Sequence, residues 1–204
     1  MKLLLASSPD LNTTQLQRLL ELVGKSRASK ALVITTAAVP YGLSPKPEWL
    51  ERAFTPLWAI CDELEETTLE DGSYLPGDLQ SYDFIYVSGG NTFYLAYQLH
   101  KTGWDKKLVD YINSGGVYVG SSAGAIILMD NIEHFATADD RIKAPAICPG
   151  LGLLTQAIIP HADNAKYSQL AADIAQKYQT DGLVVTFLND KQALLINDDG
   201  LEII

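Results

Sequence analysis

Short apolar runs alternate along this chain with stretches in which apolar residues recur every three or four positions. Apolar runs are typical of strands buried on both faces, and the wider spacing is typical of helices. The runs predict strands at residues 3–7, 31–36, 84–87, 117–120, 157–160 and 183–187, with a weaker candidate at 65–69 and a closing hairpin at 193–196 and 201–204. The spaced stretches predict helices at residues 13–23, 48–64, 93–100, 105–113 and 164–179.

This order of elements predicts an α/β fold: a single doubly wound, mostly parallel sheet flanked by helices. Right-handed crossovers bring the carboxyl ends of parallel strands to one edge of such a sheet, where ligands bind. At 204 residues and 47% hydrophobic content, the chain suits one domain spanning residues 1–204, with no internal repeat or linker. Residues 131–149 are charged and irregular, and we expect loop or short strands over the site there.

The charge balance narrows the range of partners. There are 25 acidic and 15 basic residues, and the resulting net charge of −10 argues against nucleic acid and anionic membranes. The apolar start is too short for a signal peptide, and no apolar run is long enough to span a membrane. Cys61 and Cys148 form no metal or disulfide pattern, as expected in a reducing compartment. We therefore expect a cytoplasmic protein.

Residues 118–127, Tyr-Val-Gly-Ser-Ser-Ala-Gly-Ala-Ile-Ile, carry the strongest chemical signal. They read as a strand end, a G-x-S-x-G turn and an apolar helix, which is the pattern of a nucleophile elbow with Ser122 at its tip. Gly120 and Gly124 suit a turn where strand and helix leave no space for a Cβ. The helix would direct its unpaired N–H groups toward the reacting group. The alternative is a tight strand–helix loop built from small residues.

A serine nucleophile needs a base, and the chain has three histidines. His100 ends a predicted helix, where an imidazole interacts favourably with the last carbonyls. His134 lies in the irregular stretch and receives no assignment. His161 follows a predicted strand, which places it at the functional edge of the sheet and favours it as the base. The alternative is that His161 caps a strand or a helix start.

The base normally requires a carboxylate that accepts its other N–H. The candidates are Asp139, Asp140, Asp163 and Asp190. Asp190 follows the strand at residues 183–187 and so also falls at the functional edge. The order Ser, His, Asp would differ from the Ser, Asp, His order of α/β-hydrolases, which Asp139 would restore.

An oxyanion hole requires donors from two directions. We expect the N–H of Ala123, next after the nucleophile, and that of Gly90, at the end of the neighbouring strand. Gly89 and Asn91 are then candidates for substrate binding. The alternative is a helix entry at residues 89–92, capped by Asn91 or Thr92.

We expect no cofactor and no metal. The glycine pair is not part of a G-x-G-x-x-G or a P-loop motif, so a nucleotide site is not expected. The histidines lack metal-ligand spacing such as H-E-x-x-H, and the two cysteines lie far apart in the sequence.

Three segments together resemble peptidase family S51, which includes peptidase E (aspartyl dipeptidase) and cyanophycinase. They are residues 87–93, Val-Ser-Gly-Gly-Asn-Thr-Phe, residues 120–125, Gly-Ser-Ser-Ala-Gly-Ala, and residues 159–161, Ile-Pro-His. The match extends over nearly the whole chain in order and spacing. The family's fold resembles that of class I glutamine amidotransferases, which is flavodoxin-like, with serine in place of their cysteine.

The resemblance implies a cofactor-free serine peptidase with Ser122 as nucleophile and His161 as base. Asp190 occupies the place of a family acid, and a second family proposal falls near Asp139; we favour Asp190. The expected substrates are short peptides, as for a dipeptidase, and a homodimer remains open. The alternatives are a small esterase or amidase with the same triad, and an idle binding protein. The chain lacks the arginines that peptidase E has after the histidine. Lys166 lies in this region, but its ammonium group is a point charge, whereas the guanidinium group of an arginine can bind a carboxylate through two parallel N–H groups.

Overall fold

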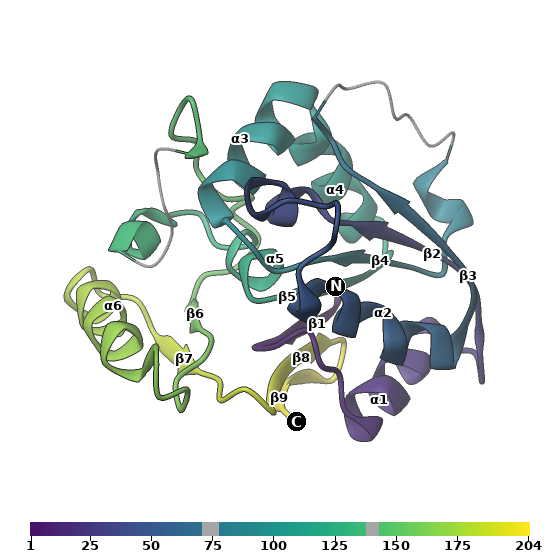
Figure 1. The fold of residues 1–204 in the computed structure, drawn as a ribbon. Helices are drawn as coiled ribbons and strands as arrows, with labels where there is room; N and C mark the ends of the chain where they lie inside the picture. Colours follow the sequence, from purple (N-terminus) through teal and green to yellow (C-terminus); the bar gives the residue numbers. More distant parts are fainter. Residues whose placement is uncertain (71–77, 138–142) are drawn as a thin grey trace.

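Seven strands form one mostly parallel sheet in the computed structural model, which describes residues 1–70, 78–137 and 143–204 (Figure 1). The strand order is β3-β2-β4-β5-β1-β8-β9. The strands are β1 (Lys2–Ala6), β2 (Ala28–Ile34), β3 (Cys61–Thr67), β4 (Phe84–Val87), β5 (Val117–Ser121), β8 (Ala193–Asn197) and β9 (Gly200–Ile203). β1 to β5 run parallel to one another, whereas β8 pairs antiparallel with β1, and β9 pairs antiparallel with β8. The predicted α/β class is confirmed.

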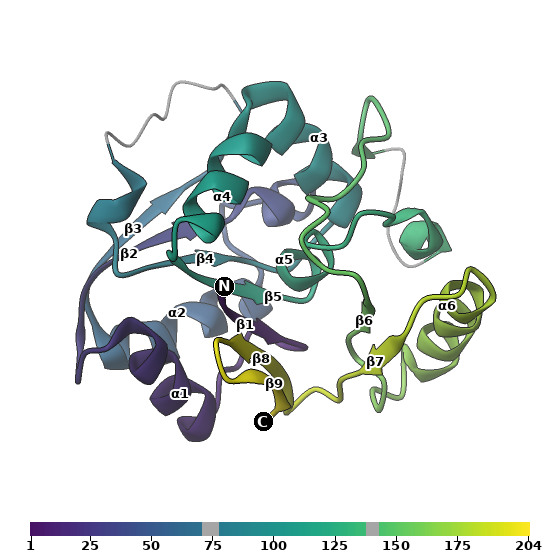
Figure 2. The ribbon, with the colours of Figure 1, turned by 180° about the vertical axis from the view of Figure 1, so that it is seen from behind.

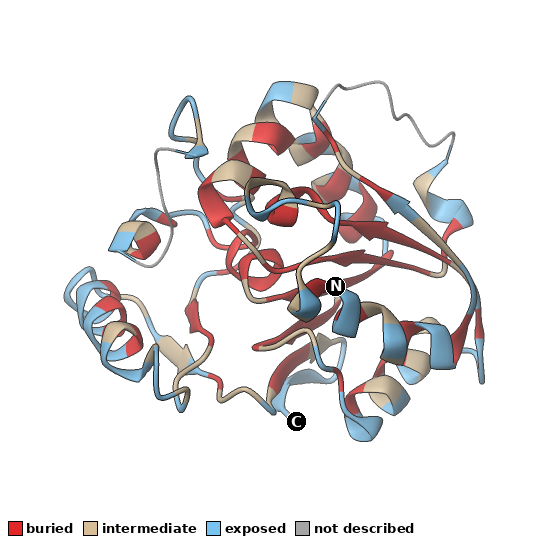
Figure 3. Ribbon diagram, viewed as in Figure 1, coloured by how far each residue is buried: buried red, intermediate tan, exposed pale blue. Residues whose placement is uncertain are grey.

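Helices cover both faces of this sheet, which is why its central strands are continuous apolar runs. On one face lie α3 (Thr92–Thr102), α4 (Trp104–Asn113) and α5 (Ala123–Ile126), and on the other lie α1 (Thr13–Val23) and α2 (Glu48–Ile60). Alternate strand residues enter the two cores: Ile85 packs on the α3 side and Tyr86 on the α1 side. Figure 3 shows the resulting layers, with buried strands between helices that are exposed on their outer surfaces.

The sequence pattern of α1 predicts its ends well. Asn12 and Gln15 form a capping box at its start, and Gly24, with φ of 76°, ends it. The prediction for α2 was too long, because residues 61–64 belong to β3. This acidic edge strand resembles a helix in composition, but it pairs with β2, whose Lys30 contacts Glu63 and Glu65.

Two predicted strands lie outside the main sheet. β6 (Ala157–Ile159) and β7 (Val185–Phe187) form a separate parallel pair, connected by α6 (Ser168–Thr180) (Figure 2). The expectation of one single sheet is therefore corrected. The reason is that β5 and β8 occupy both sides of β1, so no open edge beside β1 remains for β6.

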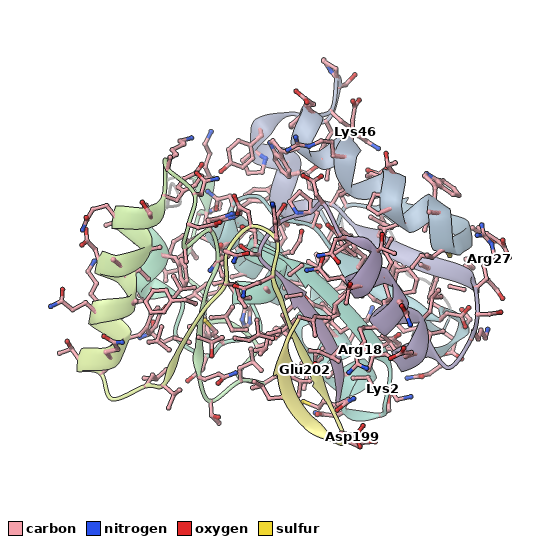
Figure 4. All side chains as sticks on the ribbon, turned by 90° about the horizontal axis from the view of Figure 1, so that it is seen from below. Lys2, Arg18, Arg27, Lys46, Asp199 and Glu202 are labelled. Carbon is pink, nitrogen blue, oxygen red and sulfur yellow. The ribbon has the colours of Figure 1, made fainter. Side chains whose placement is uncertain are left out.

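The remaining segments are short. They include the 3₁₀ helices η1 (Thr36–Tyr41), η2 (Leu79–Ser81) and η3 (Glu133–Thr137). Thus η3 occupies part of the stretch 131–149, which was expected to form loop or short strands. The predicted closing hairpin is β8–β9, which is tied to α1 by an ion pair of 2.9 Å between Arg18 and Glu202 (Figure 4). Among the described residues, no helix has the length and apolar character needed to cross a bilayer.

Candidate active site

The G-x-S-x-G turn joins β5 to α5 with almost no space between them. A Cβ on Gly120 would lie 2.3 Å from the Gly124 carbonyl oxygen, and a Cβ on Gly124 would lie 2.1 Å from that of Val87. Ser122 has a φ of 47° and a ψ of −109°, an unfavourable conformation for a residue with a side chain. The expected crowding of the elbow is therefore present.

Ser122, His161 and Asp190 form one hydrogen-bonded chain. The Ser122 hydroxyl lies 3.0 Å from His161 Nε2, and His161 Nδ1 lies 2.6 Å from Asp190 Oδ1. All three side chains are partly exposed to a cavity. The structure thus brings together a hydroxyl, an imidazole and a carboxylate in the order that activates a serine.

The backbone around His161 is held by residues that the sequence did not suggest. The His161 N–H donates to Ser7 Oγ at 2.8 Å, and the next N–H, that of Ala162, donates to the Leu188 carbonyl at 3.0 Å. Ser7 is fully buried, and its own hydroxyl donates to the Leu188 carbonyl at 3.3 Å. These bonds fix a turn in which His161 has a φ of 62°. The sequence feature that could have indicated Ser7 is its position directly after β1, at the functional edge of the sheet.

Asp190 is oriented by an amide. Asn164 Nδ2 donates to Asp190 Oδ2 at 2.8 Å, while Oδ1 faces His161. Burial raises the pKa of Asp190, but the hydrogen bonds from Asn164 and His161 outweigh it, so the pKa lies below that of an ordinary aspartate. α6 begins at Ser168, four residues later than predicted, and Asn164 lies in the turn that precedes it. Asn164, three residues after the histidine, was also missed.

Of the other candidate acids, only Asp163 belongs to the described residues. Asp163 Oδ1 accepts a hydrogen bond from the backbone N–H of Asp190 at 2.9 Å. Asp139 and Asp140 lie outside the described residues.

Two backbone donors flank Ser122. Within the described residues, the N–H groups of Gly90 and Ala123 donate no hydrogen bond. Gly90 has a φ of 137°, and a Cβ there would lie 2.1 Å from the Ala37 carbonyl oxygen, so only glycine fits. The Gly89 N–H donates to Ser121 Oγ at 3.0 Å, although Gly89 does line the cavity.

Asn91 has a structural role, so its assignment to substrate binding is corrected. Its side chain is fully buried and accepts a hydrogen bond from the Tyr94 N–H at 2.8 Å, which caps α3. It does not line the cavity. The helix-cap alternative describes this residue, since the orphan N–H groups at the start of α3 need an acceptor.

The other two histidines lie away from Ser122. His100 contacts the Pro149 carbonyl and Asp105 rather than the last carbonyls of its own helix. His134 Nε2 lies 2.6 Å from Asp181 Oδ2, and its ring packs edge-on against Tyr178. Among the described residues, no cluster of three or more histidine, cysteine or acidic side chains could hold a metal ion.

A cavity of about 380 Å³ opens at the reacting groups. Besides the residues already named, its walls include Ser8, Pro9, Tyr41, Trp49, Arg52, Ile126, Phe135, Tyr167, Leu170, Ala171 and Ile174. None of these side chains was predicted individually as a site residue, although Phe135 belongs to the stretch 131–149 that was expected to lie over the site. Trp49 and Arg52 belong to the predicted helix at residues 48–64, whose apolar periodicity indicated a helix but no role in the site.

Comparisons with known proteins show similarity over most of the chain. The family model described as "Peptidase family S51" matches residues 3–204. An uncharacterized peptidase of Listeria innocua serovar 6a is 32% identical over 151 residues, which are 73% of this chain and 71% of that protein. A peptidase E of Streptomyces coelicolor is 30% identical over 126 residues, 61% of this chain but only 50% of that protein. A crystal structure from Listeria monocytogenes EGD-e, provisionally named a peptidase E protein, superposes with a TM-score of 0.82 at 26% identity, covering 100% of this chain and 97% of that one.

Proposed function

The chain belongs to peptidase family S51, and on that premise we propose that it is a serine peptidase that cleaves short peptides through an acyl-enzyme on Ser122. The observation that carries the proposal is the hydrogen-bonded chain from Ser122 through His161 to Asp190. The N–H groups of Gly90 and Ala123, which have no acceptor among the described residues, support it.

In the first half of the reaction, the Ser122 hydroxyl attacks the carbonyl carbon of the scissile peptide bond. His161 Nε2 takes the hydroxyl proton as the new C–O bond forms. The carbonyl π electrons move to the oxygen, and the Gly90 and Ala123 N–H groups donate to the resulting oxyanion. When the oxyanion collapses, the C–N bond breaks and the leaving amine takes the proton from Nε2.

In the second half, water replaces the amine. His161 Nε2 accepts a proton from water as its oxygen attacks the ester carbonyl, and it returns that proton to Ser122 Oγ when the C–O bond breaks. Asp190 keeps its negative charge throughout, and it stabilises the imidazolium that forms twice in the cycle.

A fluorophosphonate probe tests the nucleophile directly. We expect the wild-type protein to be labelled at Ser122, with no labelling of Ser122→Ala. Ser168→Ala, which removes an exposed serine at the start of α6, is the matched control and should be labelled like the wild type. Absence of wild-type labelling, or labelling that persists in Ser122→Ala, would contradict the proposal.

A panel of dipeptides and simple esters then separates the peptidase from an esterase. We expect release of free amino acids from at least one dipeptide by the wild type and none by Ser122→Ala. Turnover confined to esters would leave the nucleophile in place but contradict the assignment of peptides as substrates.

A further inference from the structure

The cavity at Ser122 has two chemically different halves. The first, which we call the apolar half, is formed by Ile126, Phe135, Leu170, Ala171 and Ile174. These residues come from α5, η3 and α6, and all belong to or pack against the hydrophobic core on the α3 side of the sheet. Four of the five are buried, so they form a fixed wall rather than a set of exposed side chains.

The second half includes Tyr41 of η1 with Trp49 and Arg52 of α2. Of these two elements, α2 lies on the face of the sheet opposite α5. The Arg52 side chain is 55% exposed, and its Nε lies 3.5 Å from Asp10 Oδ1. Among the described lining residues, Arg52 is the only lysine or arginine, and it comes from the half away from α6.

Ser122 lies between the two halves, at the end of β5. A peptide whose scissile bond reaches Ser122 must therefore place one flanking residue toward α6 and the other toward α2. A side chain directed toward α6 meets the five hydrocarbon side chains of the apolar half. Asn164 and Tyr167, which precede α6, also line the cavity and carry polar but uncharged groups.

Lys166, the cation that precedes α6 in the sequence, does not add a charge to the apolar half. Lys166 is exposed, its Nζ lies 4.8 Å from the centre of the Tyr167 ring, and it does not line the cavity. A carboxylate placed in the apolar half would lose its water without gaining a charged partner among the described residues, which is unfavourable. An apolar side chain would instead bury its surface against the wall.

We infer that the site selects peptides in which one residue next to the scissile bond has a large apolar side chain, seated in the apolar half. This inference rests on the proposed peptidase function, because that function places the scissile bond of the peptide at Ser122. It makes the apolar wall the determinant of specificity, because the described residues offer an acidic side chain no cation on the α6 side.

Binding to the Ser122→Ala variant tests the preference without requiring turnover. Calorimetry would compare two matched pairs of dipeptides, Leu-Ala with Asp-Ala and Ala-Leu with Ala-Asp. In one pair we expect the leucine peptide to bind at least about tenfold more tightly, since an apolar pocket gains from each added methylene. Equal binding, tighter binding of the aspartyl peptide in both pairs, or no binding of any of the four would overturn the inference.

Variants in the same Ser122→Ala background locate the subsite. Leu170→Arg puts a cation into the apolar half and should remove the leucine preference while strengthening binding of the matching aspartyl peptide. Ala172→Arg adds the same charge on an exposed position of α6 outside the cavity and should keep the preference. Thermal melts followed by circular dichroism show whether Leu170→Arg is folded. If it is not, Leu170→Ser replaces it, and this variant should weaken binding of the leucine peptide about tenfold.

An unchanged preference in a folded Leu170 variant would overturn the inference. Turnover of the same dipeptides by the wild-type protein is measured separately. A leucine preference without any turnover would refute the peptidase proposal alone, whereas turnover without a leucine preference would refute the specificity alone.

Discussion

Two residues of the site, Ser122 and His161, have backbone conformations that side chains normally avoid. Their φ angles are 47° and 62°, which cost energy for any residue other than glycine. Each conformation is held from outside, since Ser122 N–H donates to the Ala6 carbonyl and His161 N–H to Ser7 Oγ. The hydroxyl and the imidazole are therefore positioned before a substrate arrives.

Replacing the acid should affect turnover more than binding. Asp190→Asn keeps the shape of the side chain but removes the charge that would stabilise the imidazolium, so we expect kcat to fall by about 10² to 10⁴. Steady-state kinetics on one peptide substrate measures this loss, and KM should change little.

The two other acidic candidates provide the controls. Asp163→Asn alters only the acceptor of the Asp190 backbone N–H, and Asp139→Asn alters a residue outside the described part of the chain. We expect both substitutions to lower kcat much less than Asp190→Asn does. If Asp139→Asn is the most damaging of the three, the acid has been assigned wrongly and the chain order is Ser, Asp, His.

The lowered pKa of Asp190 predicts how stability responds to acid. Burial raises this pKa, but the hydrogen bonds from Asn164 and His161 outweigh burial, so protons bind less readily in the folded state than in the unfolded state. An unfolded aspartate titrates near pH 3.9. The stabilisation by Asp190 is therefore complete above about pH 4 and is lost as pH falls through the lower folded pKa.

Urea unfolding of the wild type and Asp190→Asn between about pH 7 and pH 3 checks this sign. The wild type should be the more stable protein at pH 7, and its advantage should shrink below about pH 4. An advantage that grows as the pH falls would show that the pKa is raised instead.

At the scale of elements, the elbow depends on the absence of a side chain where α5 meets β4. A Cβ on Gly124 would lie 2.1 Å from the Val87 carbonyl oxygen, a contact that backbone atoms cannot relieve locally. We expect Gly124→Ala to lower the free energy of unfolding by about 3 kcal/mol or more. Urea unfolding measures this change.

Gly182→Ala is the matched control. Gly182 has a φ of 82°, but a Cβ there would meet nothing within 4 Å, so only the backbone conformation opposes the change. The expected cost is about 1 kcal/mol. Similar costs for the two variants would show that crowding at the elbow is not the main constraint.

Elements with a strong local signal were predictable from the sequence. The caps Asn12 and Gly24 determine the ends of α1, and the apolar run of β4 is found where it was expected. The boundary between α2 and β3 was not predictable, because residues 61–67 have the composition of a helix and become a strand only by pairing with β2. The separation of β6 and β7 likewise depends on which strands occupy the two sides of β1.

The residues of the site were likewise predictable only in part. The G-x-S-x-G motif predicted Ser122, the position after a predicted strand favoured His161 and Asp190, and the family resemblance supported all three. The structure has them in hydrogen-bonding contact. Ser7 and Asn164 act through contacts that depend on distant parts of the chain. A side chain such as that of Asn91 can cap a helix or bind a ligand, and only the fold decides which.

At the scale of the whole molecule, we expect activity without a metal ion. The three histidines have carboxylate or carbonyl partners, and no metal-binding cluster occurs within the described ranges of the chain. Peptide hydrolysis should therefore persist after exhaustive treatment with a chelator. Loss of activity that zinc restores would contradict the serine mechanism.

The central claim is that Ser122 and His161 act as one chemical unit, and a double-mutant cycle tests it most directly. The measurement is kcat for the wild type, Ser122→Ala, His161→Ala and the double variant on one peptide substrate. Groups that share a single step fail together, so we predict that each single variant loses nearly all turnover and that the double variant is little worse than either. Losses that simply add in the double variant would contradict the account.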